Sequence, residues 1–366
     1  IMKLTIKQDN LARALNAVGR VATAKAGMPI LANILLRTDQ NKLTIAATNL
    51  EVAIISVIGA QVKEQGAITV PARLLTDFIS NLPHTNIALE TDESKLKVST
   101  EGFKSTINSI LADDYPALPE SDEKDKLKVS AEELKKSISR TALVSSNDTT
   151  RPILTGVYLY SQGGQLYMVA TDGYRLAESQ LIESKQDVSA IIPSSTLAEV
   201  VRLLGDLTEV EVKYKDDQIT FLLDNVSITS RLIDGKFIDY RQLIPTETNY
   251  QITVERSELI KIVKVAELFA RESAGSIIIE GNPTDKLLSV RSITSQLGDN
   301  TSSIEADIVA KGTEPYMVSL NSKFLLDALN CLEGDKVRIM FNGKLTPVLL
   351  LGEKSDYRHI IMPVKS

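Results

Sequence analysis

A five-residue segment in the middle of the chain groups side chains that could do chemistry. In Thr171-Asp172-Gly173-Tyr174-Arg175, a hydroxyl, a carboxylate, a phenol and a guanidinium stand side by side. The segment is either a catalytic or binding cluster or a polar turn. The turn interpretation has a physical basis, because Asp and Gly favour turns and the flanking residues alternate as strands do. The corresponding segment of the first third of the chain, 47–53, lacks Asp, Gly and Arg. We therefore interpret the turn as architectural and its polar side chains as particular to the middle of the chain.

Other residues with catalytic potential form no recognisable constellation. His84 and His359 are the two histidines and have no partner pattern, and no spacing suits zinc, a phosphate-binding loop or a serine nucleophile. Cys331 lies in an apolar helical stretch, which favours a buried structural thiol. Adjacent acidic residues, such as Asp113-Asp114, have turn-like surroundings. The sequence therefore favours a binding protein without cofactor or metal over an enzyme.

The composition is that of a globular protein. The chain has 366 residues, of which 43% are hydrophobic and 24% charged, enough for two or three domains. A single cysteine suits a reducing cytoplasm, and we find no apolar run near the length of a membrane span. The net charge of −6 argues against a surface coated in basic residues, although a local basic face is compatible with it.

One pattern recurs three times along the chain. A short alternating strand, a polar cap and an amphipathic helix occur at 3–18, 126–141 and 251–266. A strand that turns into a second helix follows at 67–82, 189–204 and 316–331. Each copy closes on an Asp-Tyr pair, at 114–115, 239–240 and 356–357. The period is that of a whole domain and not of a solenoid.

The repeat predicts an α+β protein of three like domains. Two amphipathic helices per copy can cover one face of a sheet, and the remaining strands are short, with turn residues typical of antiparallel sheets. The boundaries are expected in polar stretches, which gives domains at 1–123, 124–247 and 248–366.

With the repeat in place, four stretches carry a resemblance to a known family. These are "VPARLL" (70–75), "ATDGYRLA" (170–177), "LIDGKFIDYRQLIP" (232–245) and "IIMPVKS" (360–366). Together, on a triple repeat, they make the chain resemble the bacterial DNA sliding clamp, the beta subunit of DNA polymerase III, over residues 2–366.

The resemblance implies three clamp domains per subunit and a homodimer that closes head-to-tail into a ring. It implies that the ring encircles double-stranded DNA without reading its sequence. It further implies that the ring tethers the replicative polymerase, the clamp loader and other proteins carrying a clamp-binding peptide. Such a processivity factor catalyses no reaction and needs no cofactor.

A DNA-encircling ring should be more basic where DNA passes than elsewhere. The first helix of each copy, with its flanks, carries an excess of positive charge of four (3–25), one (132–151) and one (255–271). Against the net charge of −6, the rest of the chain carries −12. Strong phosphate contacts would hinder sliding, so a modest excess suits the role. Helical spacing and the resemblance predict DNA-facing residues Arg13, Arg20, Lys25, Lys136, Arg140, Lys264 and Arg271. Ordinary solvated helix faces would give the same spacing.

The resemblance also implies a pocket between the second and third domains that binds linear peptides. Carried over position by position, it would use Arg151, Leu154, Thr171, Gly173, Tyr174, Arg175, Leu176, Ile238, Gln242, Leu243, Asn321, Phe324, Leu345, Ile360, Met362, Pro363, Val364 and Lys365. Aliphatic side chains would supply apolar contact, while arginines and the Gly173 backbone would orient the peptide. Ile238, Gln242 and Phe324 replace residues frequent in the family (Pro, Arg and Tyr), and the chain ends Lys-Ser rather than Arg-Leu. These departures leave the pocket itself expected, but the resemblance does not extend to its partner preferences.

For the ring contact, the resemblance points to an edge strand of the first copy and to the end of the third copy's first helix. The expected interface residues are Lys104, Ser105, Ile107, Leu268 and Phe269. Two alternatives stay open. One is an enzyme with Asp172, Tyr174 and Arg175 as its polar centre. The other is a scaffold that docks linear peptides but never binds DNA.

Overall fold

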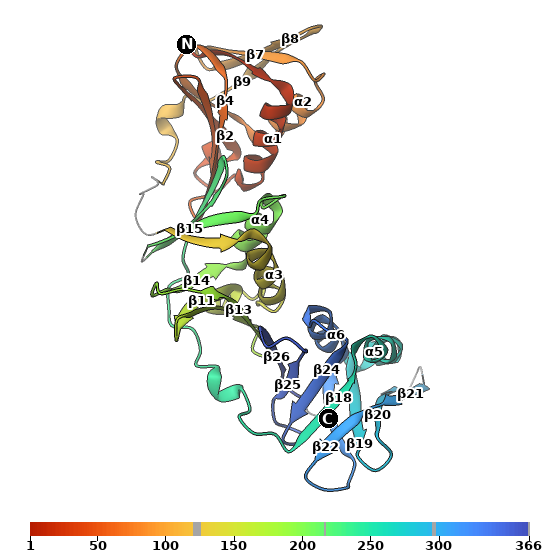
Figure 1. Cartoon of the computed structure of the whole chain (residues 1–366). Coiled ribbons are helices and arrows are strands. Elements are labelled where there is room, and N and C mark those ends of the chain that lie inside the picture. The colour runs from red at the N-terminus through yellow and green to blue at the C-terminus, as the bar shows by residue number, and fades with distance from the viewer. Residues whose placement is uncertain (120–125, 216, 295–297, 365–366) are drawn as a thin grey trace. The chain divides into compact units, whose positions relative to one another are not determined.

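A computed structural model of the chain describes residues 1–119, 126–215, 217–294 and 298–364. The chain forms two compact units, which Figure 1 shows together. Unit 1 comprises residues 1–132 and 195–232, and unit 2 comprises residues 133–194 and 233–366. We call the three sequence copies repeats I, II and III. Repeat I lies in unit 1, repeat III lies in unit 2, and repeat II contributes to both.

Unit 1 contains two antiparallel sheets. The five-stranded sheet has the order β5 (Gln61–Glu64), β1 (Lys3–Lys7), β7 (Asn86–Asp92), β8 (Lys95–Thr100) and β9 (Phe103–Asn108). The eight-stranded sheet has the order β10 (Lys126–Ser130), β15 (Glu209–Lys215), β16 (Gln218–Leu223), β17 (Val226–Arg231), β4 (Val52–Gly59), β3 (Lys42–Thr48), β2 (Asn33–Asp39) and β6 (Ala67–Pro71). Helices α1 (Gln8–Val18) and α2 (Ala72–Ser80) pack side by side. Helix α4 (Ser194–Leu203) also belongs mainly to this unit.

Unit 2 repeats this plan. Its nine-stranded sheet has the order β14 (Ser189–Pro193), β11 (Gly156–Gln162), β12 (Gln165–Thr171), β13 (Arg175–Glu183), β26 (Tyr357–Ile361), β25 (Val348–Leu351), β24 (Lys336–Phe341), β18 (Tyr250–Glu255) and β22 (Asp307–Ala310). Its four-stranded sheet has the order β21 (Gly298–Glu305), β20 (Leu287–Thr294), β19 (Ser276–Asn282) and β23 (Tyr316–Asn321). The helices are α3 (Ala131–Ala142), α5 (Arg256–Ala270) and α6 (Ser322–Cys331).

Two sheets therefore cross from one repeat to the next. β17 of repeat II pairs with β4 of repeat I, and β26 of repeat III pairs with β13 of repeat II. We call these crossings junction I–II and junction II–III. Both crossings are antiparallel, and each places the last strand of one repeat beside the strand that follows a tight turn of the preceding repeat.

The predicted helices and their buried faces are confirmed. Each repeat begins strand–helix, as β1–α1, β10–α3 and β18–α5. The apolar stripe of each first helix is buried, and it consists of Leu11, Leu15 and Val18, of Leu134 and Ile138, and of Leu259, Val263 and Ala266. Among the described helices, none has both the length and the apolar character that crossing a membrane requires.

The expectation of polar side-chain caps before these helices is wrong where the cap geometry is described. Lys7 before α1 and Glu255 before α5 make no side-chain cap hydrogen bond. Instead, the first backbone N–H of each helix donates to a carbonyl of a neighbouring loop: Gln8 to Thr85, Ala131 to Thr208 and Arg256 to Asp335, at 2.9, 3.0 and 2.7 Å. Because these loops satisfy an otherwise unpaired N–H, the helices start directly from the strands.

Candidate peptide-binding site and nucleic-acid face

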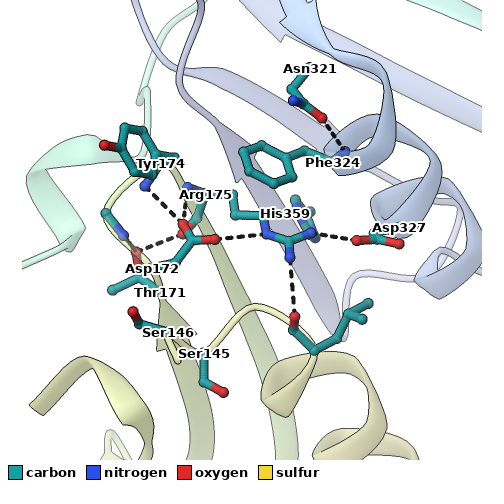
Figure 2. Close-up of polar contacts among 12 residues, drawn as sticks. Ser145, Ser146, Thr171, Asp172, Tyr174, Arg175, Asn321, Phe324, Asp327 and His359 are labelled. Carbon is teal, nitrogen blue, oxygen red and sulfur yellow. Dashed lines mark hydrogen bonds and ion pairs between the residues drawn. The ribbon is translucent and has the colours of Figure 1, made fainter. Parts of the chain in front are cut away.

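The segment 171–175 is a tight turn between β12 and β13, which we call the repeat II turn (Figure 2). Thr171 Oγ1 donates to the carbonyl of Arg175 at 2.6 Å and accepts from the N–H of Gly173 at 3.0 Å. Asp172 Oδ1 accepts from the N–H groups of Tyr174 and Arg175 at 2.9 and 3.0 Å. Gly173 has a φ of +93°, a conformation that favours glycine because it has no Cβ. The architectural interpretation of these residues is thus confirmed.

Arg175 connects this turn to two helices. Its side chain is 9% exposed and bonds to Asp172 Oδ2 at 3.1 Å, to Asp327 Oδ2 of α6 at 2.6 Å and to the carbonyl of Leu143, just beyond α3, at 3.2 Å. The guanidinium also lies 4.3 Å from the ring centre of Phe324. Figure 2 shows these contacts around the Arg175 side chain. Arg175 therefore links the turn to both helices, and the charges of Asp172 and Arg175 are taken up in an ion pair with each other.

His359 lies fully buried in β26 near this arginine. Its Nδ1 is 2.7 Å from the Tyr357 hydroxyl, and its Nε2 has no hydrogen-bond partner among the described residues. Burial, and secondarily the charge of Arg175, lower its pKa to about 3. His359 is therefore neutral at physiological pH. The part of the chain that the structure describes contains no group of three or more His, Cys, Asp or Glu side chains able to hold a metal ion.

A hollow of about 410 Å³ lies beside the repeat II turn. Four predicted residues line it: Arg151, Asp172, Tyr174 and Arg175, of which Asp172 was predicted only as part of the enzyme alternative. Sequence reasoning missed Leu143, Ser145, Ser146, Asn147, Lys323 and Asp327. Lys323 and Asp327 flank the predicted Phe324 on α6 and could have been found by helical spacing. The loop 143–147 carries no comparable signal.

The apolar residues predicted for the pocket fall into a buried and an exposed group. Leu176 and Ile360 pair across β13 and β26 and belong to a buried apolar cluster against which Leu243 packs. Tyr174, at 64% exposure, and also Ile238 and Leu345 present apolar surface to solvent. Two backbone bonds fix the C-terminal segment of 362–364, because Met362 N–H donates to the carbonyl of Tyr174 and Val364 N–H to that of Ser319, both at 2.8 Å.

Short-range polar bonds hold the other predicted positions. Leu154 accepts from the N–H of Ser146 at 2.8 Å, Gln242 Nε2 donates to the Asp239 carbonyl at 3.0 Å, and Asn321 Oδ1 caps α6 at Phe324 N–H, 3.1 Å away. Pro363 is half-buried. Lys365 lies outside the described residues.

A buried tyrosine network anchors the segment that carries Ile238 and Leu243. The Tyr240 hydroxyl donates to Glu178 Oε2 and lies beside the Tyr160 hydroxyl, each at 2.5 Å. Burial, then Glu178, raises the pKa of Tyr240 far above its usual range, so its proton stays in place. Phe237 stacks on Tyr158 with ring centres 5.0 Å apart.

The predicted DNA-facing residues divide into two groups. On and after α1, Arg13, Arg20 and Lys25 are exposed, and Lys25 pairs with Glu51 at 3.3 Å. On and after α5, Lys264 and Arg271 are exposed.

Lys136 and Arg140 of α3, which were also predicted to face DNA, are held in ion pairs. Arg140 has a side chain only 6% exposed and contacts Glu333 Oε1 at 2.5 Å and Asp356 Oδ2 at 3.0 Å. Lys136 Nζ contacts the same two carboxylates at 2.8 and 2.9 Å. Both cations are therefore paired with carboxylates of repeat III, which reduces the positive charge that α3 can present.

Four of the five predicted interface residues are at least partly accessible, whereas Ile107 is buried. β9 is an edge strand of the five-stranded sheet, with Lys104 exposed, Ser105 half-buried and Ile107 turned into the covered face. Near the end of α5, Leu268 is 53% exposed and Phe269 is half-buried.

Comparisons with known proteins agree along the whole chain. The family models of the DNA polymerase III beta subunit match in order, with the N-terminal domain at residues 2–119, the central domain at 128–239 and the C-terminal domain at 241–365. The beta sliding clamp of Synechococcus elongatus is 30% identical, with 100% of this chain and 99% of the relative covered.

Solved structures give the same result. The DNA polymerase sliding clamp from Bacillus subtilis matches with a TM-score of 0.94 and 27% identity, covering 100% of this chain and 99% of that one. The sliding clamp from Pseudomonas aeruginosa bound to griselimycin matches with a TM-score of 0.91 and 26% identity, with both chains fully covered. The chain has three clamp domains and belongs to the DNA polymerase III beta subunit family, the bacterial sliding clamps.

Proposed function

We propose that two copies of this chain close into a ring around duplex DNA and act as a non-catalytic processivity clamp. The ring tethers the replicative polymerase and other proteins to DNA and opens for a clamp loader. The observation that carries the proposal is the ordered match of three sliding-clamp domains over residues 2–365, together with the likeness of the whole fold to solved clamps. We place the protein in the cytoplasm, where bacterial DNA is replicated.

The cations on and just after α1 and α5 support a weak electrostatic contact with DNA. Arg13, Arg20, Lys264 and Arg271 are exposed, whereas the whole chain carries −6. Dense phosphate contacts would bind DNA tightly and in a strongly salt-dependent way, which opposes sliding. A ring held by topology needs only a mildly positive lining, and the neutralisation of Lys136 and Arg140 leaves that lining weaker still.

The surface around the repeat II turn supports a docking site for linear peptides. Tyr174, Ile238 and Leu345 are exposed apolar side chains near a preformed scaffold, in which Arg175 and Tyr240 are locked by hydrogen bonds. A rigid site with a few apolar anchors binds an extended peptide at low entropic cost. Ile238, Gln242 and Phe324 would set which partner peptides bind best. An enzyme at this place is disfavoured because Asp172 and Arg175 bond to each other and to the protein frame.

The ring contact is proposed between β9 of one copy and the end of α5 of its partner. β9 has a free sheet edge whose backbone groups can pair, and Leu268 supplies exposed apolar surface.

Negative-stain electron microscopy without imposed symmetry tests the ring. We expect a closed annulus wide enough for duplex DNA. The variant Leu268→Asp should give separated subunits, while Val309→Asp, an exposed site on β22, should leave the annulus intact. Compact particles or open crescents from the unchanged protein would overturn the proposal.

A further inference from the structure

The repeat I turn (Thr48–Val52) has the same hydrogen bonds as the repeat II turn. Thr48 Oγ1 donates to the carbonyl of Val52 and accepts from the N–H of Leu50, both at 3.0 Å. Asn49 Oδ1 accepts from the N–H of Val52 at 2.8 Å. Thr171 and Asp172 make the equivalent bonds in repeat II. The two turns are therefore one backbone structure with different side chains.

At both turns, the residue after the last strand pairing of the following repeat donates a backbone hydrogen bond to the same position of the turn. Arg231 N–H donates to the carbonyl of Glu51 at 2.8 Å, as Met362 N–H donates to that of Tyr174 at 2.8 Å. The positions thus correspond one by one. Leu50 stands where repeat II has Gly173, Glu51 where it has Tyr174, Val52 where it has Arg175, and Arg231 where repeat III has Met362.

A hollow of about 330 Å³ lies at the repeat I turn, within unit 1. Leu50, Val52, Leu118 and Pro119 give it an apolar part, and Arg231 and Gln218 give it a polar part. Leu118 follows Tyr115 by three residues, as Leu243 follows Tyr240, so the linker after each repeat contributes an equivalent leucine. Both junctions thus combine a turn, a linker leucine and the last strand of the next repeat.

Leu50 is held in an unfavourable conformation at this place. Its φ is +74°, in the region where glycine is favoured and where a Cβ crowds the backbone. The side chain is also 39% exposed, so burial does not explain why an aliphatic residue is kept at a position suited to glycine. A strained, exposed apolar side chain at the edge of a hollow points to a ligand contact.

The charges of the hollow favour an anionic group. Glu51 is paired with Lys25 at 3.3 Å. The guanidinium of Arg231 is exposed and forms no ion pair within the described part of the chain. A ligand with an aliphatic side chain and a carboxylate would therefore complement Leu50 and Leu118 on one side and Arg231 on the other.

We propose that junction I–II is a second docking site, which takes an extended peptide segment of a partner protein carrying an aliphatic residue close to a carboxylate. This inference depends on the proposed function in one respect: the second site is argued by analogy with the peptide site proposed at junction II–III. Arginine in place of Met362 makes the second site select for acidic segments.

Methyl-resolved NMR of the full-length protein, labelled on Ile, Leu and Val, tests this site. The probes are the capped peptides acetyl-Leu-Ala-Asp-amide and acetyl-Leu-Ala-Asn-amide. We expect the aspartyl peptide to shift the methyl signals of Leu50, Val52 and Leu118 in a saturable manner. Binding should weaken at least fivefold with the asparaginyl peptide or with Arg231→Gln. Leu50→Gly should lose binding without lowering Tm, because it relieves the strained φ.

The same spectra separate this proposal from the proposed function, because Leu154 and Leu345 report on the junction II–III site. Shifts confined to Leu154 and Leu345 would overturn the second site and leave the first intact. Equal shifts at Leu50 with both peptides, or with Arg231→Gln, would also overturn it, because the carboxylate would then have no role.

Discussion

Junctions I–II and II–III share a backbone but are held together differently. At junction II–III, Arg175 bonds to Asp172 and Asp327, and Arg140 bonds to Glu333 and Asp356, all with little exposure of the arginines. At junction I–II, Val52 occupies the place of Arg175, and Arg202 of α4 donates to the backbone carbonyls of Asn16 and Ala17 at the end of α1, at 3.3 and 2.8 Å. The duplicated turn is thus a common frame. Ionic side chains at junction II–III hold a specific site in place, whereas junction I–II relies on apolar packing and helix-end carbonyls.

Removing the central arginine should have the largest effect on stability. Arg175→Ala leaves the carboxylates of Asp172 and Asp327, which are 17% and 20% exposed, without their cation. This should lower the free energy of unfolding by about 3 kcal/mol, the low end of the range for a buried ion pair. The matched change Val52→Ala removes only buried methyl groups and should cost about 2 kcal/mol. Urea denaturation of both variants measures the difference. Equal losses would mean that the ionic contacts of Arg175 do not distinguish the junctions.

Acid should weaken the ionic junction specifically. Hydrogen bonds from Lys136, then Lys354, lower the pKa of Glu333 from 4.5 to about 2. A carboxyl whose pKa falls on folding stabilises the protein above the unfolded pKa and loses that contribution as pH falls toward the folded one. Glu333→Gln should therefore be less stable than the unchanged protein above pH 4.5.

The difference between these two proteins should close between pH 4.5 and about 2. Urea midpoints across this range measure it. A difference independent of pH would show that Glu333 contributes by packing and not by charge. Val52→Ala serves as the control at junction I–II, because its side chain carries no titratable group, whereas Arg202 also pairs with the Glu199 carboxylate at 2.6 Å.

Exchanging the residues at the tip of the two turns should have a smaller effect, of opposite sign in each repeat. Gly173→Leu forces a side chain into the left-handed region and should cost about 1–2 kcal/mol. Leu50→Gly relieves the same strain, but the gain is reduced by about 0.5–1 kcal/mol because glycine makes the unfolded chain more flexible. Thermal unfolding of both variants gives the signs. A stabilising Gly173→Leu would contradict the equivalence of the turns.

Charge reversal should leave the stability of the protein unchanged when it is made near α1 and should reduce stability when it is made on α3. Arg13→Glu with Arg20→Glu changes exposed side chains on and just after α1, so Tm should stay the same while association with duplex DNA at low salt weakens. Lys136→Glu with Arg140→Glu places like charges beside Glu333 and Asp356 and should lower Tm. If only the second variant lost its association with DNA, α3 and not α1 would be the helix that faces DNA.

The helices, the strands and their threefold repetition could be predicted from the sequence alone. Apolar spacing identified the stripe of Leu11, Leu15 and Val18, and Asp172-Gly173 identified the turn. Both signals are local, since a helix face and a turn depend on residues a few positions apart.

Features that depend on distant residues could not be predicted. Spacing places Arg140 on a helix face but cannot show that Glu333 and Asp356, some 200 positions later, neutralise it. Likewise, no residue within β17 indicates that β4 of the preceding repeat is its partner. The loop 143–147 entered the candidate site because Leu143 accepts from Arg175, a contact with no pattern in the sequence.

The central claim is that the repeat II turn, and not its repeat I counterpart, holds the peptide by which the replicative polymerase is tethered. Fluorescence anisotropy with the clamp-binding peptide of the same bacterium's replicative polymerase tests it, using the matched variants Tyr174→Ala and Glu51→Ala. Both positions are exposed, so neither change should unfold the protein. We expect Tyr174→Ala to weaken binding roughly tenfold or more, as loss of an aromatic anchor does. Glu51→Ala should bind as the unchanged protein does. Equal affinity for Tyr174→Ala and the unchanged protein, or equal losses in both variants, would contradict the account.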